Sequence, residues 1–519
     1  MPSRLLGAFL FAVSLVLCCQ TTAQDDSGWW ISPERINIQV GEDRPLQLLN
    51  ESAQELQGLT WAVDNPNLAE LREEQGRMVL YAKAAGTVRV SASWNSENRF
   101  REVTIWPADH PLPKGTTHWG MRPIGRDIDD LPAVPTDNGA DIFSLEQNSN
   151  ATYLRGTLND GIQLWAWRLP ENTRNVDLVF GDWSGGALIS ANKRQSFTLY
   201  DVGKDGKLRW QRSFAGARKS QANNHDRLIQ VVSQSPDGNS TTFTALDETS
   251  GAQKFQLTVP ASLYRQVHVE RRQNDLVCGS KTIDMPIKTI PSKIFVGMDG
   301  FTYLAFTVSQ WTMSAPACKP GELLTANDVD FSRENKLWLW QIHADGTYRS
   351  TIVEESKTAR PFSVATDVAS PTGALIPDGL GGELLSVRWD RMDGTQKLHN
   401  SPDELLYRID AGGNVIYKFP LPQYDGKLQD DMVLGENNSG FLTRGSVLVA
   451  FSTETGKELW HWDSNTPEIS VFAALADGSC AVKVGDSVLA VGEGQEPRLI
   501  AHGDVMINWQ GQLFVKHKN

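Results

Sequence analysis

Short runs of alternating apolar and polar residues occupy most of this 519-residue chain. Residues 36–40 alternate in this way and stop at Gly41, and residues 86–93 form another such run. A period of two residues is that of a β-strand with one buried face, and the turn formers Gly, Asn, Asp and Pro separate the runs. The pattern therefore predicts an all-β protein.

Five such runs fall within residues 29–107, a length that suits a small β-sandwich. The segments ISPERINIQVGE, WAVDNPNLAEL and LYAKAAGTVRVSASW, the last followed by VTI, resemble the bacterial Ig-like domains of group 2. The resemblance implies an Ig-like domain that acts as a rigid spacer, or as a module that contacts carbohydrate or cells.

Residues 108–146 are rich in proline and predict an extended connector. Three carboxylates cluster here, from Asp127, Asp129 and Asp130. They lack the Asp/Asn/Gly loop of an EF-hand, so a solvated acidic turn is the simpler interpretation and no metal site is predicted.

An aromatic residue recurs through the remaining segment, residues 147–519, at spacings that include 45, 45 and 43 residues. The positions are Trp165, Trp210, Phe255, Tyr348, Tyr417 and Trp460. All but the first follow a turn with glycine, the residue that best tolerates positive φ. A period in the low to mid forties with four strand-like pieces per unit is typical of a β-propeller blade.

Units of this kind are expected near residues 175–215, 222–260, 262–355, 360–420, 427–463 and 468–503. The third is long, and either one blade with an inserted loop or two degenerate blades would fit. Residues 151–169 and 505–517 each look like half a blade, and their pairing would close the ring. The count is then seven blades, with eight as the alternative.

Two hairpins of the array resemble the PQQ-like, or quinoprotein-like, β-propeller repeat, Ala-x-Asp-x-x-Thr-Gly-x-x-x-Trp. The positions that match are Ala450, Thr455, Gly456 and Trp460 in one copy, and Ala245, Asp247, Gly251 and Phe255 in the other. In that family the tryptophan packs between blades and the turn residues tie neighbouring blades together. The resemblance implies an N-terminal Ig-like β-sandwich followed by a seven-bladed, alternatively eight-bladed, PQQ-like β-propeller.

The N-terminus has the form of a secretory signal peptide over residues 1–23, with Arg4 before a short apolar run. Leu17 is bulky where a lipobox has a small residue, so no lipid anchor is predicted at Cys18. No later stretch has the roughly 20 apolar residues of a membrane span. We expect a protein that is secreted, periplasmic or on the cell surface. Its net charge of -13 argues against nucleic acid as a partner.

Three cysteines follow the signal peptide, and an oxidising compartment would allow one bridge. Cys278 and Cys318 lie within the long third unit, on either side of its irregular insertion, and are the predicted pair. Cys480 lies in an apolar strand pattern and is expected to be an inert buried thiol.

Motifs of catalysis are largely missing from the sequence. No G-x-S-x-G elbow or H-E-x-x-H pattern occurs, and His225-Asp226 has no clustered partner. The aromatics Trp183 and Trp311 lie near predicted loops, where contact with a ligand or burial between blades would both explain them. We predict no catalytic residue, metal or cofactor, and an exported binding or scaffold protein with a protein or carbohydrate partner. The alternative is an enzyme with an axial site, either a degenerate quinoprotein dehydrogenase or a carbohydrate-active enzyme.

Overall fold

The computed structural model describes residues 28–516 apart from a series of short gaps. The gaps are residues 34, 51–53, 75, 110–118, 121–125, 150, 160, 171–174, 224–225, 274, 290, 292–293, 298–299, 362–364, 378–381, 394–395, 398–402, 421–427, 436–437, 468, 476 and 508–512. The signal peptide predicted at residues 1–23 lies outside the described residues. The chain forms two compact units: one runs to Asp127 and includes Glu146–Arg168, and the other comprises Ile128–Leu145 and Leu169–Asn519.

The first unit is a two-sheet β-structure around one core. Its sheets have the orders β1-β3-β6-β5 and β4-β7-β8-β2-β9, and the unit also contains the antiparallel pair β12–β13. Ile38 and Val103 from one sheet and Leu80 from the other are fully buried and share the core. The strands are β1 (Trp29–Ser32), β2 (Arg35–Gln39), β3 (Asp43–Asn50), β4 (Thr60–Val63), β5 (Ala69–Glu74), β6 (Arg77–Ala82), β7 (Gly86–Trp94), β8 (Glu97–Trp106), β9 (Trp119–Gly120), β12 (Thr152–Thr157) and β13 (Gln163–Arg168).

The proline-rich segment contains regular structure that its composition did not predict. Strands β10 (Arg126–Pro132) and β11 (Ile142–Gln147) form within it, and the amide of Ala133 donates to the carbonyl of Asp141 at 2.8 Å. The predicted segment boundaries at residues 107, 146 and 147 stay predictions.

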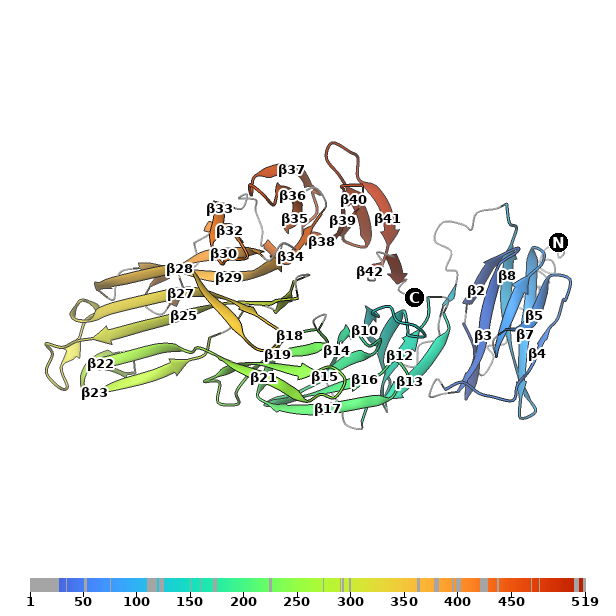
Figure 1. Ribbon diagram of the computed structural model, residues 1–519, viewed down its shortest axis with the longest axis horizontal. Coiled ribbons are helices and arrows are strands. Elements are labelled where there is room, and N and C mark those ends of the chain that lie inside the picture. Colours follow the sequence, from blue (N-terminus) through green and yellow to red (C-terminus); the bar gives the residue numbers. More distant parts are fainter. Residues whose placement is uncertain are drawn as a thin grey trace, which may run out of the picture. The chain divides into compact units, whose positions relative to one another are not determined.

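The second unit is a series of sheets that follow one another along the chain, with mainly antiparallel pairing (Figure 1). Four of them are four-stranded meanders, which we call sheets 1, 2, 5 and 6; the third and fourth carry additional strands. Sheet 1 contains β14 (Val176–Gly181), β15 (Ala187–Lys193), β16 (Ser196–Val202) and β17 (Leu208–Ala215); sheet 2 contains β18 (Ala217–Asn223), β19 (Leu228–Gln234), β20 (Thr241–Asp247) and β21 (Gln253–Val259).

Sheet 3 contains β22 (Ser262–Arg272), β23 (Asp275–Ile287), β24 (Phe295–Val296), β25 (Thr302–Ser314), β26 (Leu323–Leu324), β27 (Asp330–Ile342) and β28 (Tyr348–Pro361); sheet 4 contains β29 (Ala365–Pro377), β30 (Glu383–Asp393), β31 (Gln396–Lys397), β32 (Asp403–Ile409) and β33 (Val415–Pro420). Sheet 5 contains β34 (Leu428–Leu434), β35 (Ser439–Arg444), β36 (Val447–Ser452) and β37 (Glu458–Asp463); sheet 6 contains β38 (Ile469–Ala474), β39 (Cys480–Val484), β40 (Ser487–Val491) and β41 (Arg498–His502). The units expected from the repeat spacing correspond to these six sheets.

Each pair of successive sheets shares a buried cluster. Phe197 of sheet 1 packs with Ile229 of sheet 2, and similar clusters join sheets 2 and 3, 3 and 4, 4 and 5, and 5 and 6. Apolar burial of this kind contributes about 25 cal/mol per Å² of surface removed from water. The prediction of an all-β chain is confirmed, and its four-stranded sheets stack in a propeller-like series.

The predicted closing pair is not formed among the described strands. β42 (Asp504–Ile507) and β43 (Leu513–Lys516) pair with each other in a two-stranded sheet, and the described residues add no third strand to it. The prediction that this hairpin completes a blade with residues 151–169 is therefore wrong for the described strands. β42 and β43 pair only with each other, and β12 and β13 belong to a different sheet.

Helix is nearly absent from the described residues, which contain a single 3₁₀ turn, η1 (Ala326–Asp328). In the part of the chain that the structure covers, no helix has the length and apolar character needed to cross a bilayer.

Candidate functional site

Sheet 3 has longer strands than sheets 1 and 2. β23, β25, β27 and β28 have 13 or 14 residues, whereas the strands of sheets 1 and 2 have six to eight. Their inner halves, around Leu304 and Leu339, pack against sheets 2 and 4. Their outer halves run on together with the β22–β23 hairpin (Figure 1). We call this outer part, residues 262–287, 309–335 and 355–361, the extension of sheet 3.

The extension has a core of its own. β22 pairs in parallel with the outer half of β25, from Leu263–Gln310 to Val267–Ser314. Between them a cluster forms from Tyr264, Val269, Met313, Val329 and Phe331, all at most 7% exposed. The hairpin is therefore packed against the rest of the sheet. This packing stabilises it, because an isolated two-stranded hairpin is only marginally stable in water.

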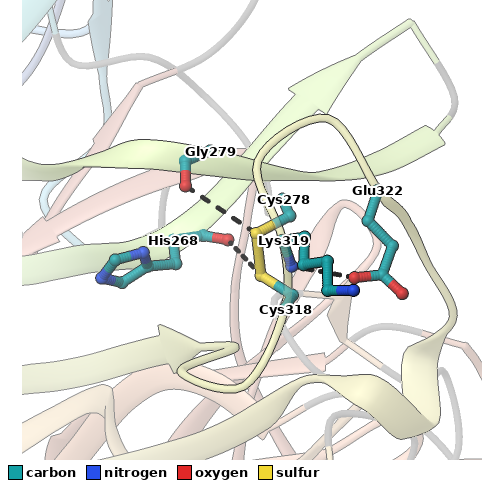
Figure 2. Close-up of a disulfide and its surroundings, with 6 residues drawn as sticks. All are labelled: His268, Cys278, Gly279, Cys318, Lys319 and Glu322. Atoms are coloured by element: carbon teal, nitrogen blue, oxygen red, sulfur yellow. Dashed lines mark hydrogen bonds between the residues drawn. A yellow bond between two sulfur atoms is a disulfide. The ribbon is translucent and has the colours of Figure 1, made fainter.

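A disulfide between Cys278 and Cys318 holds the extension's long loop against the hairpin, and the predicted bridge is present (Figure 2). Backbone bonds flank it: the amide of Cys278 donates to the carbonyl of Glu322 at 2.7 Å, and the amide of Gly321 donates to the carbonyl of Cys278 at 2.8 Å. The Sγ of Cys318 lies 3.6 Å from the carbonyl oxygen of His268, a contact without a hydrogen because the sulfur is bridged. The tip of the hairpin is thus tied to the loop by covalent and polar links.

A surface hollow of about 430 Å³ lies on one face of the hairpin, and its lining residues are Tyr264, Gln266, Glu270, Arg271, Ile283 and Met285. The pairing register explains the lining, because Tyr264 lies opposite Met285 and Gln266 lies opposite Ile283. Directly opposed residues of an antiparallel pair point to the same face of the sheet. The hollow therefore has a floor of both apolar and polar side chains and a charged rim.

The polar groups in the hollow's floor are already paired. The hydroxyl of Tyr264 donates to the Sδ of Met313 at 2.5 Å and accepts from the Nε2 of Gln266 at 2.7 Å. Burial raises the pKa of Tyr264, so this phenol is neutral at physiological pH. A neutral hydroxyl that already makes two hydrogen bonds can contribute to a binding surface, but it is not a base that could abstract a proton.

An exposed apolar row continues from the hollow along β23. Ile283, Met285 and Ile287 are 40%, 42% and 37% exposed, and their spacing of two residues places them on one face. The opposite face carries a bidentate ion pair, with Arg265 Nε and Nη2 at 2.7 and 2.9 Å from the carboxylate of Asp284. A single exposed apolar side chain is ordinary, but an exposed apolar row beside a hollow is typical of a contact surface.

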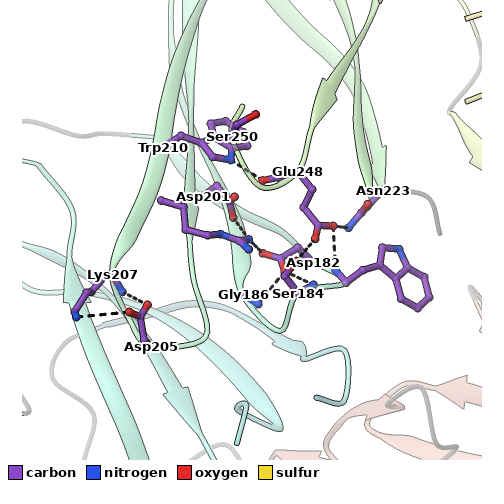
Figure 3. A network of polar contacts seen from close by, with 12 residues as sticks. Asp182, Ser184, Gly186, Asp201, Asp205, Lys207, Trp210, Asn223, Glu248 and Ser250 are labelled. Carbon is purple, nitrogen blue, oxygen red and sulfur yellow. Dashed lines mark hydrogen bonds and ion pairs between the residues drawn. The ribbon is translucent and has the colours of Figure 1, made fainter. Parts of the chain in front are cut away.

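A second polar cluster joins sheets 1 and 2 (Figure 3), and its carboxylate residues are buried. Arg209 forms ion pairs with Asp182 and Asp201, the latter at 2.7 Å, and both carboxylate residues are 0% exposed. Burial, followed by the nearby charge of Asp182, raises the pKa of Asp201 to about 8, and burial also raises the pKa of Asp182.

Glu248 of sheet 2 completes this cluster. Its carboxylate accepts from the hydroxyl of Ser184 at 2.5 Å, from the amide of Trp183 at 3.1 Å and from Asn223 Nδ2 at 3.0 Å (Figure 3). Two carboxyls with raised pKa values could serve acid–base chemistry in an open cleft. Here the carboxyls are buried, so the cluster stabilises the contact between the two sheets.

The residues of the repeat motif lie within sheets 2 and 5, away from the hollow. Ala245 and Ala450 are 0% exposed on β20 and β36. Gly251 has φ +65 and lies under the indole of Trp210, where a Cβ would be 2.5 Å from the ring. Phe255 is arranged in the same way over Gly346 of sheet 3, with a Cβ distance of 2.7 Å.

The other motif residues are turn or strand positions of the same hairpins. The amide and hydroxyl of Ser250 donate to Asp247 at 2.9 and 2.8 Å, closing one turn. The amide of Thr455 donates to Ser452 at 3.2 Å and that of Gly456 to the Ser452 carbonyl at 2.7 Å, closing the other. The ring of Trp460 lies 5.9 Å from that of Phe441.

The remaining candidates divide between structure and site. His225 lies outside the described residues, and Asp226 is exposed. The ring centroid of Trp311 lies 5.8 Å from that of Tyr264, a residue that lines the hollow. In the described part of the chain no group of three His, Cys, Asp or Glu side chains could hold a metal ion.

Sequence reasoning missed the β23 row. The alternation of Ile283, Met285 and Ile287 was the available signal, but Pro286 interrupts the strand pattern and the stretch was interpreted as an irregular insertion. Only the pairing with β22 shows that the three side chains share a face with the hollow.

No family model and no curated protein matches the sequence. Among solved structures the chain is similar to a virginiamycin B lyase from Staphylococcus aureus (11% identity, 69% of this chain and 95% of that one, TM-score 0.32). It is also similar to a periplasmic gluconolactonase from Pseudomonas aeruginosa (12%, 79% and 98%, TM-score 0.34) and to prolyl oligopeptidase B from Galerina marginata (10%, 74% and 54%, TM-score 0.41). All identities are below 25% and all TM-scores below 0.5, so these similarities assign neither a reaction nor a ligand to this chain.

Proposed function

We propose that the chain is an exported, non-enzymatic binding or scaffold protein whose extension of sheet 3 presents the binding surface. The frame of this proposal is a PQQ-like propeller of seven blades, or eight, with a group 2 Ig-like domain as spacer. The observation that carries it is the apolar row of Ile283, Met285 and Ile287 beside the hollow. The oxidised Cys278–Cys318 pair is compatible with export.

The chemistry of the surface favours a protein partner over a glycan. Sugars are held by aromatic platforms and dense hydrogen-bonding groups, whereas this row is aliphatic and the Tyr264 hydroxyl is already engaged. Methionine adapts to varied apolar partners, and apolar cores with charged rims are common in protein interfaces. Glu270 and Arg271 supply such a rim here.

The rigidity of the extension supports the same function. Its separate core and its disulfide hold the hairpin in one conformation before any partner arrives. A surface ordered in advance loses less side-chain and backbone entropy on binding. The enzyme alternative finds less support, because the paired carboxyls of Asp182 and Asp201 are enclosed between sheets.

Site-specific photo-cross-linking in the natural host tests the proposal. A benzoylphenylalanine at Met285 should give a discrete protein adduct after illumination. The same probe at Leu459, which is 52% exposed on β37 of sheet 5, is the matched control and should give none. Equal adducts from both positions, or none from Met285 while a glycan array retains the protein, would overturn the assignment.

A further inference from the structure

The outer edge of β23 is open over most of its length. On its inner side β23 pairs with β22 from Ser262–Ile287 to Arg272–Asp275. On its outer side it pairs only at Leu276 and Val277, with β26. From Gly279 to Ile287 none of the described strands lies against this edge. A row of unpaired backbone amides and carbonyls is a template for another strand.

The position of Pro286 indicates which backbone groups face outward. Opposed residues of an antiparallel pair alternate between those bonded to each other and those whose N–H and C=O point away. Pro286 lies opposite Leu263 and has no N–H, so it suits the outward-facing class. Asp284 and Thr282, two and four residues earlier, then belong to the same class. Their amides and carbonyls are the free groups of the edge.

The side chains along this edge indicate what an added strand would carry. Ile283 and Met285 would lie beside its alternate residues, so these would be apolar. Lys281, Lys288 and Arg271 are exposed, and no ion pair holds them among the described residues. Asp284, by contrast, is paired with Arg265. The local surface is therefore cationic although the chain as a whole carries -13, which favours acidic residues in the partner.

We propose that the edge of β23 binds an extended segment of a partner protein as an added β-strand, with apolar residues alternating with acidic ones. This inference rests on the proposed binding function and names the partner's chemistry. Main-chain hydrogen bonds to Thr282 and Asp284 would supply affinity. Ile283 and Met285 would contact alternate side chains of the added strand and so supply specificity. A second copy of this chain would present an edge of the same charge, which disfavours self-pairing.

Lysine and proline on an edge strand also guard against aggregation. Lys281 and Pro286 fit that role too, and both roles agree with the proposal. Pro286 ends the ladder of free amides, and Lys281 selects against strands that are not acidic. The edge is thereby limited to short, charge-matched segments.

Residue-resolved amide exchange on the purified full-length protein tests the inference. The probes are two nine-residue peptides, one alternating Val with Glu and one alternating Val with Lys. Saturation with the Val-Glu peptide should slow exchange at Thr282 and Asp284 by about tenfold or more, while Ile283 and Met285, bonded to β22, change little. The Val-Lys peptide should have no such effect.

Variants separate this inference from the proposed function. Thr282→Pro removes one outward amide, and Thr282→Val, which keeps it, is the matched control. The photo-cross-linked partner should bind Thr282→Pro about fivefold or more weakly and Thr282→Val normally. Full binding to Thr282→Pro combined with loss in Met285→Glu would overturn the added strand and leave the binding surface intact. Unchanged binding in both variants would overturn both proposals. Concentration-dependent dimers that protect Thr282 without peptide would assign the edge to a second copy.

Discussion

The indole Nε1 of Trp210 on β17 donates a hydrogen bond of 2.7 Å to the carbonyl oxygen of Glu248 on the neighbouring sheet. The same indole covers Gly251, and the guanidinium of Arg212 donates to the Gly251 carbonyl at 3.0 Å. One turn of sheet 2 is thus capped by the outer strand of sheet 1. The motif that resembles a redox family acts at this place as a joint between sheets.

Replacing Gly251 with alanine should destabilise the joint. Gly251 has φ +65, which costs an alanine roughly 1 kcal/mol, and the new Cβ would meet the Trp210 ring at 2.5 Å. Overpacking of this kind adds about 1–3 kcal/mol. Gly485→Ala is the matched control, because Gly485 has φ +58 and no atom within 4 Å of an added Cβ. Urea unfolding followed by tryptophan fluorescence should give a lower midpoint for Gly251→Ala, and equal midpoints would contradict the contact.

Asp201 makes stability depend on pH in a defined direction. Burial and then Asp182 raise its pKa to about 8, well above the roughly 3.9 of an unfolded chain. The folded state therefore binds more protons over this interval, and the contribution of Asp201 is full below about pH 4 and lost as pH rises through about 8. The stability difference between the wild type and Asp201→Asn should fall from pH 5 to pH 9.

A non-titrating change in the same sheet provides the control for this experiment. Leu199→Ala removes a side chain that is 0% exposed on β16 and should cost about 2–5 kcal/mol at every pH. If the Asp201→Asn difference is constant or increases with pH, the enclosed carboxyl cluster is wrongly described.

Loss of the Cys278–Cys318 disulfide should loosen the extension without unfolding the other sheets. The bridge closes a separation of 40 residues, for which a contribution of about 2–4 kcal/mol is typical. The double variant Cys278→Ser, Cys318→Ser should show faster amide exchange in β22, β23 and the loop before β26. Exchange in β15 and β16 of sheet 1 should not change. Acceleration of equal size in both regions would show that the extension has no separate core.

Cys480 should be unreactive in the folded protein. Its thiol is 0% exposed on β39, and burial raises its pKa to about 12, so the reactive thiolate is scarce at neutral pH. In protein that lacks residues 1–23, the native state should release no chromophore from a disulfide reagent at pH 8, and one equivalent per chain should appear in denaturant. Rapid labelling of the native protein would contradict this burial.

The repeat spacing predicted the positions of six sheets because each hairpin carries its own local signal, such as Ser250-Gly251 before Phe255. The bridge between Cys278 and Cys318 was predicted because these two cysteines lie on either side of the irregular insertion in the third unit. Local signals say little about pairing at a distance. The expected union of residues 151–169 with 505–517 failed for that reason, and β10 and β11 were missed because they lie in a segment with many prolines.

The candidate site was beyond sequence reasoning for a related reason. Tyr264 and Met285 are opposed only because a bulge between Val267 and Val269 sets the register of the hairpin. The cluster of Asp182, Arg209 and Glu248 likewise joins residues far apart in the chain. Neither arrangement leaves a spacing rule in the sequence.

The affinity of the cross-linked partner for surface variants tests the binding account most directly. Met285→Glu places a charge at the centre of the apolar row, and Leu459→Glu makes the same change on exposed β37. The account predicts that Met285→Glu weakens binding by about 30-fold or more, equivalent to a lost anchor of about 2 kcal/mol, while Leu459→Glu binds as the wild type. Equal affinity of the two variants for the partner would contradict it.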